Sequence, residues 1–186
     1  MPTLFRVFPW LTGAKIAEPG GALHTPPQGG GRIDNPGLYA VLYLGGDPAG
    51  AIAEAFGRFP EWTSAVFEGS PSLPGSVRAL AQFRFPDDVP VCNLDDPAQL
   101  LALGLRPSDI VSRDYAVTRT WARRIHDRRR WKGLSWWSYY NPEWFSFGLW
   151  DIAGLRLEAV RPLSPEDPDV VEASKKIVRR IVQRRN

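Results

Sequence analysis

Residues 30–54 read GGRIDNPGLYAVLYLGGDPAGAIAE, a glycine loop followed by an arginine, an apolar run and a second glycine turn. The run Leu38–Leu44 predicts a strand, and Asp47 before a proline predicts the start of a helix. Glu54 lies on that helix among apolar neighbours, where a carboxylate costs free energy unless it is partnered or functional. Periodicity alone leaves two interpretations of Glu54 open, a functional carboxylate or a solvated position on an amphipathic helix.

The composition fits one globular domain over residues 1–186, since 44% of the residues are hydrophobic. Eighteen prolines and seventeen glycines predict many loops and short elements. Cys92 is the one cysteine and lies in an apolar run, so we expect a buried structural thiol. With His24 and His126 as the only histidines, no metal site is expected. The sequence shows no leader or membrane-spanning run, which predicts a soluble, cytoplasmic protein.

Positive charge is concentrated in the carboxy-terminal third. Residues 1–118 hold 8 Lys and Arg against 12 Asp and Glu, whereas residues 119–186 hold 15 against 8. The basic runs are Arg119–Lys132 and Lys175–Arg185. Such runs are typical of contacts with nucleic acid or an acidic partner, but also of the solvated face of a helix, and we favour the second interpretation.

The elements expected from periodicity and punctuation describe a mixed protein. Strands are predicted at Leu4–Phe8, Leu38–Leu44, Val77–Phe85, Val89–Leu94 and Leu155–Val160. Helices are predicted from Pro48 to Gly57, from Pro97 to Gly104, from about Ser112 to Arg129 and from about Pro165 to Arg185. Residues 17–31 are expected to form a long loop. This pattern has no regular βαβ alternation, so it predicts an α+β fold with a small mixed or antiparallel sheet.

Three common enzyme signatures do not fit. The turn Gly45–Gly50 lacks the Lys-Ser/Thr pair of a P-loop, and the glycines at 29–31 lack the spacing of a Rossmann site. No GxSxG nucleophile elbow is present in the sequence.

The order of residues around Glu54 resembles the RES domain, a family named for its arginine, glutamate and serine. Its pattern is a glycine and an arginine, an Asp/Asn–Pro–Gly turn, a strand that ends in tyrosine, and a capped helix with a glutamate. The matching segments are Gly31-Arg32, Asp34–Gly37, Leu42-Tyr43 and Ala51–Glu54. The resemblance extends to Phe5–Val7, Tyr115–Ala122 and Lys132–Ser138, and it covers residues 4–157.

The resemblance implies an ADP-ribosyltransferase-like fold, a split mixed or antiparallel sheet flanked by helices, with NAD in a cleft. It implies a toxin-type enzyme that cleaves the nicotinamide–ribose bond of NAD by phosphorolysis or hydrolysis. NAD is then a substrate, inorganic phosphate a co-substrate of phosphorolysis, and no prosthetic group is needed. The implied partner is an Xre-like helix-turn-helix antitoxin, and the oligomeric state stays open. Two alternatives remain: transfer of ADP-ribose to a protein, and a non-catalytic module that binds nucleic acid through its basic segments.

The resemblance also assigns roles to individual residues. Glu54 is the catalytic candidate, because a carboxylate stabilises the oxocarbenium character that develops on the ribose. Arg32 is a candidate for catalysis and for gripping the phosphates of NAD, and Arg6 is either a second phosphate ligand or a structural residue. Ser138 is also a catalytic candidate, expected to hydrogen-bond the ribose or to orient Glu54, with Ser135 as the alternative serine.

Aromatic residues form the last group of candidates. Tyr43, at the end of a predicted strand, is expected to bracket the nicotinamide. Tyr39 is a weaker candidate, because its even spacing from Tyr43 predicts that both lie on one face of that strand. A further aromatic cluster could wall a pocket, although packing in the core or at a partner interface is favoured for most of its members, which are Trp131, Trp136, Trp137, Tyr139, Tyr140, Trp144 and Trp150.

Overall fold

The structure, a computed structural model, describes residues 2–182. Its main sheet has seven strands in the order β5-β6-β7-β2-β1-β4-β8. These are β1 (Thr3–Trp10), β2 (Leu42–Gly45), β4 (Val77–Arg84), β5 (Cys92–Asn93), β6 (Gly133–Trp137), β7 (Phe145–Leu149) and β8 (Arg156–Pro162). Because β5 and β6 run parallel while the other neighbours are antiparallel, the sheet is mixed.

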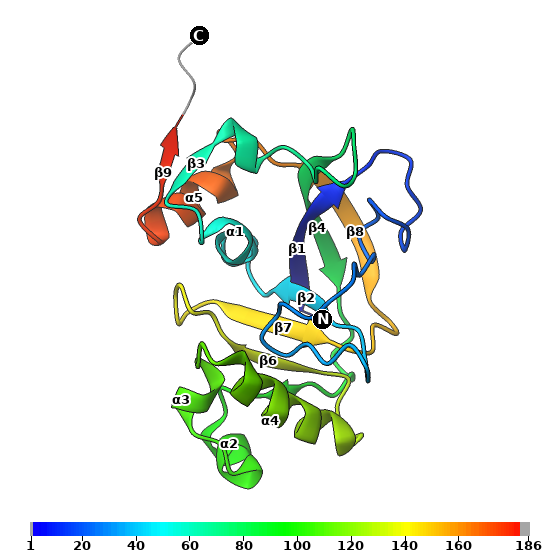
Figure 1. Ribbon diagram of the computed structural model, residues 1–186, viewed down its shortest axis with the longest axis vertical. Helices are drawn as coiled ribbons and strands as arrows, with labels where there is room; N and C mark the ends of the chain where they lie inside the picture. Colours follow the sequence, from blue (N-terminus) through cyan, green and yellow to red (C-terminus); the bar gives the residue numbers. More distant parts are fainter. Residues whose placement is uncertain (1, 183–186) are drawn as a thin grey trace.

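Helices flank both ends of this sheet, as the predicted α+β class requires (Figure 1). They are α1 (Pro48–Phe56), α2 (Pro97–Leu103), α3 (Pro107–Ile110), α4 (Tyr115–Asp127) and α5 (Pro168–Lys176). Helices α2 to α4 cover the part formed by β5, β6 and β7, where Trp121 and Leu134 share one buried cluster. Helices α1 and α5 pack together near β1, with Ile52 and Val170 in a second buried cluster.

The sheet is split between β1 and β2. These two strands pair only at Phe5 and Gly45, whereas β1 pairs with β4 over its whole length and β2 with β7 over four residues. Figure 1 shows β1 leaving β2 at a steep angle. The sheet therefore consists of two halves, β1-β4-β8 and β5-β6-β7-β2, that separate beyond Phe5. This division confirms the expected split, mixed sheet.

Two predicted helices have the expected ends. The Asp47 side chain accepts a hydrogen bond from the Gly50 N–H, so it caps α1, and the helix ends at Gly57. Asp96 caps α2 in the same way, and Gly104 ends it in the left-handed conformation with φ 66°. The third predicted helix is shorter than expected, since Asp114 caps α4 and the helix ends at Asp127.

The prediction of a long carboxy-terminal helix, from about Pro165 to Arg185, is wrong. Helix α5 ends at Lys176, and Val178 has a left-handed φ of 54° that stops any helical continuation. The chain then forms β9 (Arg180–Val182), which pairs in parallel with β3 (Glu61–Thr63), just before the short 3-10 helix η1 (Ser64–Val66). The β-branched residues of this segment therefore lie in a strand, and pairing with β3 provides hydrogen-bond partners for its backbone N–H and C=O groups. The predicted residues 183–185 lie outside the described part.

Three strand predictions need correction. Strand β2 begins only at Leu42, because residues 35–39 form a turn closed by hydrogen bonds from Leu38 and Tyr39 to the Asn35 carbonyl. Strand β5 is restricted to Cys92–Asn93, and β8 extends to Pro162. The periodicity analysis missed β7, whose sequence FSFGL is short and does not alternate cleanly.

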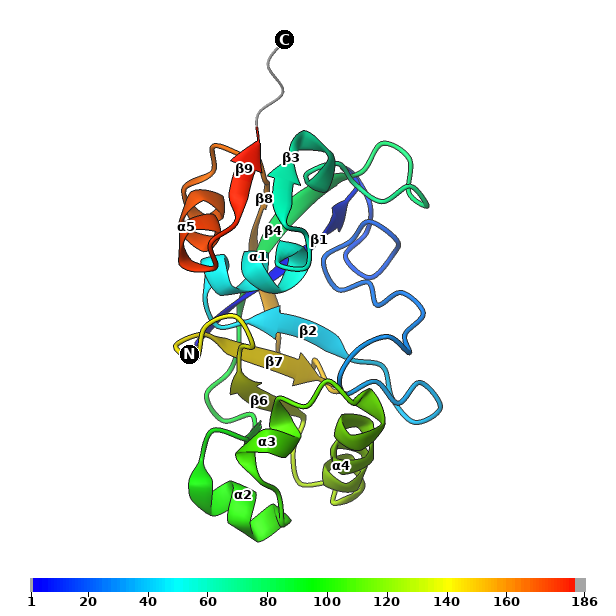
Figure 2. The ribbon, with the colours of Figure 1, turned by 60° about the vertical axis from the view of Figure 1, so that its left-hand side comes forward.

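The predicted loop and the predicted buried thiol are both confirmed. Residues 11–41 contain no helix or strand beyond one bridge between Asn35 and Tyr39, and Figure 2 shows them along one side of the molecule. Cys92 is fully buried at the start of β5, and this burial raises the pKa of its thiol to about 12. At neutral pH the thiol is therefore protonated, as expected for a structural residue.

Candidate active site

A cavity of about 310 Å³ opens where β1 and β2 separate. The two diverging strands supply opposite walls, with Arg6 and Val7 on β1 and Tyr43 and Leu44 on β2. Helix α1 contributes Glu54, the one carboxylate among the described residues that line this cavity. The remaining wall is largely aromatic and comprises Tyr115, Trp136, Trp137 and Tyr139. The split in the sheet thus creates the site, and we call it the main cavity.

Glu54 faces the main cavity and is held by serines. The Ser138 hydroxyl donates a hydrogen bond to Glu54 Oε1 at 2.5 Å, and Ser146 of β7 and the Tyr139 backbone lie near enough to the carboxylate to help lower its pKa. The side chain is open to the cavity, yet protein surrounds it on its other sides. This burial raises the pKa of Glu54 above its ordinary value, while the Ser138 bond and the Arg32 charge oppose that rise.

The structure distinguishes the two candidate serines. Ser138 follows β6, is buried, and receives a hydrogen bond on its Oγ from the Tyr140 N–H at 3.1 Å. That bond fixes the hydroxyl so that its proton points at Glu54. Ser135 lies within β6, and its Oγ contacts Asn93 at 3.4 Å, away from Glu54. Ser138 is therefore the serine that meets the carboxylate.

Ser146 is a site residue that sequence reasoning missed. It lies in β7 opposite Trp136 of β6, and it lines the main cavity. Only the antiparallel pairing of β6 with β7 brings it to Glu54, and β7 itself carried no clear periodic signal.

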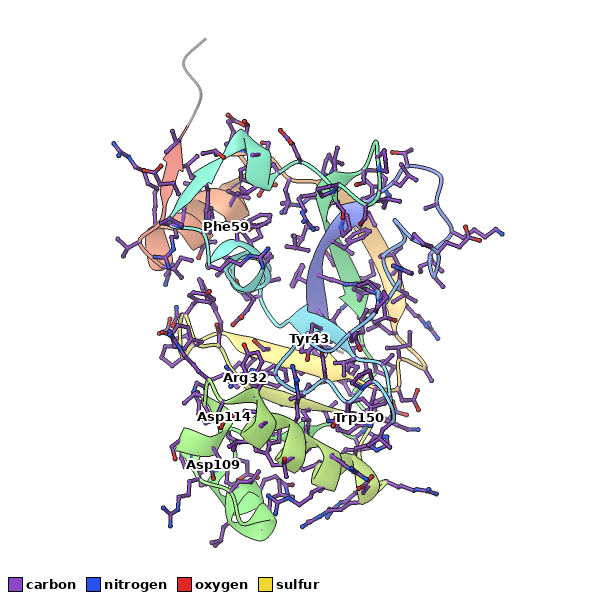
Figure 3. The ribbon with its side chains drawn as sticks, viewed as in Figure 1. Arg32, Tyr43, Phe59, Asp109, Asp114 and Trp150 are labelled. Carbon is purple, nitrogen blue, oxygen red and sulfur yellow. The ribbon has the colours of Figure 1, made fainter. Side chains whose placement is uncertain are left out.

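Arg32 lies at the rim of the main cavity and connects two segments. Its Nη1 donates to the carbonyls of Ile110 and Ser112, at 2.7 and 2.6 Å, and its guanidinium lies 5.5 Å from the centre of the Tyr115 ring. Figure 3 shows Arg32 and Tyr43 close to the point where the two halves of the sheet meet. Arg32 therefore has a structural role in addition to any contact with a ligand.

Asp34 organises the glycine loop, although its predicted role was only in a turn. Its carboxylate accepts hydrogen bonds from the N–H groups of Gly29 and Gly31, at 2.8 and 2.6 Å, and from the Tyr43 hydroxyl at 2.6 Å. A Cβ atom on Gly31 would collide with Tyr43 and Asp34, so only glycine permits this close approach. Asp34 is 3% exposed, and its three donors explain how a carboxylate is accommodated there.

Tyr43 reaches the main cavity, whereas Tyr39 does not. Burial and the bond to Asp34 raise the pKa of Tyr43 well above its usual range, so its hydroxyl stays a donor. Its ring lies edge-on to Trp136 at 6.5 Å between ring centres. The Tyr39 hydroxyl donates instead to the Ile33 carbonyl at 2.8 Å, and its ring packs against His126 and Trp150. The predicted shared face is wrong because β2 starts after Tyr39.

Arg6 lines the main cavity and also anchors the long loop. Its two amino groups donate to the carbonyls of Ala22 and His24, at 2.6 and 2.8 Å. Burial lowers the pKa of Arg6 to about 10, so the group remains charged at neutral pH. Among residues 2–182 its hydrogen-bond partners are thus carbonyls of the loop.

The aromatic cluster divides as expected between wall and core. Trp136, Trp137 and Tyr139 line the main cavity. Trp131 and Trp144 are buried in two different core clusters. The remaining two, Tyr140 and Trp150, are partly buried and pack against these same clusters, so packing is the principal role of four of the seven members.

The fold and the cavity define a class of α+β proteins with an acid-bearing cleft in a split sheet. A family model described as the RES domain matches residues 3–170, so the chain belongs to the RES-domain family. The match extends past the expected end at residue 157 to the start of α5.

Among solved structures, the chain is similar to one described as the M. tuberculosis MbcT-MbcA toxin-antitoxin complex. The TM-score is 0.60 at 15% sequence identity, and the match covers 95% of this chain and 88% of the other. At that identity the likeness establishes the fold. No curated protein matches the chain by sequence. Within residues 2–182, no helix combines the length and apolar character needed to cross a membrane.

Proposed function

We propose that this protein is a toxin-type enzyme that consumes NAD by cleaving its nicotinamide–ribose bond. The observation that carries the proposal is the Glu54 carboxylate, held by Ser138 and facing a cavity with Arg32 on its rim. A cavity with aromatic walls, one carboxylate and arginines suits a ligand with a flat base, a ribose and phosphates. A cytoplasmic location and NAD as substrate follow from the same proposal.

In the proposed reaction the bond between ribose C1 and the nicotinamide nitrogen breaks. Its electron pair goes to the nitrogen, so the pyridinium leaves as neutral nicotinamide, and positive charge develops on the ribose. Ionised Glu54 stabilises that charge, and the Ser138 hydroxyl keeps the carboxylate oriented. An acceptor oxygen then bonds to C1.

We propose inorganic phosphate as the preferred acceptor. Among the described residues that line the main cavity there is no histidine, and the one carboxylate is committed to the ribosyl cation. The Tyr43 hydroxyl, with its pKa well above the usual range, is no base at neutral pH. Water needs a general base, whereas phosphate is already an anion that arginines attract. The product is ADP-ribose 1″-phosphate, and hydrolysis is slower.

A product assay tests this function. Purified protein is incubated with NAD, with and without inorganic phosphate, and the products are identified by mass spectrometry. We expect nicotinamide and ADP-ribose 1″-phosphate in phosphate, and slow release of ADP-ribose without it. ADP-ribose alone at saturating phosphate would identify a hydrolase, and label on protein with little free product would identify a transferase. Intact NAD in every condition would reject the proposal.

We further propose an Xre-like helix-turn-helix antitoxin as partner. The structural neighbour is a toxin–antitoxin complex, which supports a partner of that general kind. The loop of residues 17–31 accepts hydrogen bonds from Arg6, and its last residue, Gly31, lines the main cavity, so a protein bound there would cover that cavity. Co-expression with the adjacent helix-turn-helix protein should relieve growth inhibition, and failure of the two proteins to bind would contradict the assignment.

The Ser138 contact makes a separate prediction about pH dependence. The hydrogen bond from Ser138 opposes the rise in the pKa of Glu54, so Ser138→Ala should raise that pKa further. Because Glu54 acts when ionised, the acid limb of the kcat/KM profile should move to higher pH, with kcat about tenfold lower. Ser135→Ala, within β6 and away from Glu54, serves as the control and should keep the wild-type profile. An unshifted limb in Ser138→Ala would contradict the positioning role.

A further inference from the structure

A second cavity of about 310 Å³ adjoins the main cavity along β1. The two cavities share Arg6 and Val7 as wall residues. The other walls of the second cavity come from the loop of residues 19–26, from residues 70–73 and from Arg78 of β4. A ligand could therefore extend from one cavity into the other past Arg6.

The second cavity is electropositive. Arg78 and Arg6 supply the positive charge, His24 also lines the cavity, and no Asp or Glu does within the described residues. Burial lowers the pKa of Arg78, and the nearby positive charge of Arg58 lowers it further. The hydroxyls of Ser70 and Ser72 complete the polar lining.

Arg78 differs from Arg84 and Arg161, two other arginines of the same sheet. Arg84, on the same strand, pairs with Glu158 at 2.9 Å, and Arg161 of β8 pairs with Asp167 and Asp169. Across residues 2–182 the guanidinium of Arg78 has neither an ion pair nor a hydrogen bond, although it is partly buried. A partly buried cation without a counter-charge beside another cation is unfavourable for stability, so an anionic ligand would relieve that cost.

The volume of the main cavity also favours a ligand that extends into the second cavity. The main cavity is at the small end of the range of about 300–1,000 Å³ that small-molecule sites span. A dinucleotide has two nucleosides, so the reacting half of NAD in the main cavity leaves its adenosine half to be placed elsewhere. The second cavity, which begins at Arg6, provides that space.

We propose that the second cavity is a phosphate-binding subsite in which Arg78, assisted by Ser70 and Ser72, holds a phosphate group. The phosphate comes either from the adenylate half of NAD or from free inorganic phosphate, and its identity rests on the proposed function. A guanidinium suits this chemistry because its planar fork makes charge-assisted bonds to two phosphate oxygens.

Calorimetry with three probes tests the subsite. NAD, AMP and inorganic phosphate are each titrated into Glu54→Gln protein, which is used so that turnover of NAD is slow during the measurement. Arg78→Gln is added to this background, with Arg156→Gln as the control, since Arg156 is an exposed arginine of β8 outside both cavities. Both variants lose one positive charge from the same sheet. Melting temperatures verify folding, and Arg78→Lys, which keeps the charge, should retain part of the affinity.

The probes separate the outcomes. If the adenylate phosphate is the ligand, Arg78→Gln should weaken binding of NAD and AMP roughly tenfold or more. If free phosphate is the ligand, only binding of inorganic phosphate should weaken by that factor. Affinities for all three probes equal to those of Arg156→Gln would overturn the subsite. Failure of wild-type protein to cleave NAD would reject the proposed function alone, because AMP and phosphate still report on Arg78.

Discussion

Glu54→Gln is expected to lower kcat for NAD cleavage by about 10²–10³-fold, the usual effect of removing one preorganised charge from a developing transition state. Glutamine keeps the shape of the side chain and can still accept the hydrogen bond from Ser138. What it loses is the negative charge that opposes the ribosyl cation. Initial rates of nicotinamide release at saturating NAD measure this loss, and wild-type turnover would remove Glu54 from the mechanism.

The stability of Glu54→Gln should be equal to or higher than that of the wild type, although its activity is lower. Burial raises the pKa of Glu54, so the folded protein binds that proton more tightly than the unfolded chain does. Ionisation of Glu54 therefore lowers stability as the pH rises from the ordinary pKa to the raised one. At neutral pH, Glu54→Gln should melt at or above the wild-type temperature, and the difference should shrink as the pH falls.

A matched control separates this effect from a general loss of charge. Glu172 is an exposed glutamate on α5, far along the chain from the site. Glu172→Gln should change neither kcat nor the pH dependence of melting. A lower melting temperature in Glu54→Gln at neutral pH would show that the carboxylate serves the fold, not catalysis.

The predictable part of this protein is governed by local chemistry. Helix α1 follows from Asp47, the proline after it and Gly57, because capping and backbone preference act within a few residues. Glu54 could be identified from sequence for the same reason, because a carboxylate stands out in an apolar stretch of such a helix. The fold class followed from the mixture of such elements, and the split in the sheet followed from the family resemblance.

The missed part depends on contacts between distant segments. The run Ile177–Val182 has a helical spacing of apolar residues, yet pairing with Glu61–Thr63 decides its structure, and no local signal reveals that partner. The contacts of Ser146 and Asp34 in the site were not predicted for the same reason, because they too depend on distant segments. Ser146 reaches Glu54 through the pairing of β6 with β7, and Asp34 meets Tyr43 only after the turn at residues 35–39 has folded.

Arg32 is the residue for which the structure changes the expected result of a mutation. From sequence, Arg32→Ala should weaken NAD binding with little effect on melting. The structure shows two hydrogen bonds from Arg32 to the Ile110 and Ser112 carbonyls, so the variant should also lose stability, by about 1–3 kcal/mol at typical values per bond. A drop in NAD affinity alone would therefore not distinguish a ligand contact from a loosened rim.

Arg119 supplies the control that resolves this ambiguity. It lies on α4 outside the main cavity and also makes two hydrogen bonds to backbone carbonyls, those of Gly31 at 3.0 Å and Gly29 at 2.5 Å. Arg119→Ala should therefore cost a similar amount of stability and loosen the same glycine loop. If Arg32 grips the dinucleotide, Arg32→Ala should weaken NAD binding by tenfold or more beyond Arg119→Ala, because charge-assisted bonds are worth about 1.5–3 kcal/mol.

The comparison is best made by calorimetry on Glu54→Gln protein at a temperature where both arginine variants are folded. Arg32→Lys adds a test of geometry, since it keeps the charge but lacks the planar fork that binds two phosphate oxygens at once. Its affinity for NAD should fall between those of wild type and Arg32→Ala. Equal losses in Arg32→Ala and Arg119→Ala would mean that Arg32 acts by holding the loop, and phosphate recognition would then fall to Arg6, which also lines the cavity.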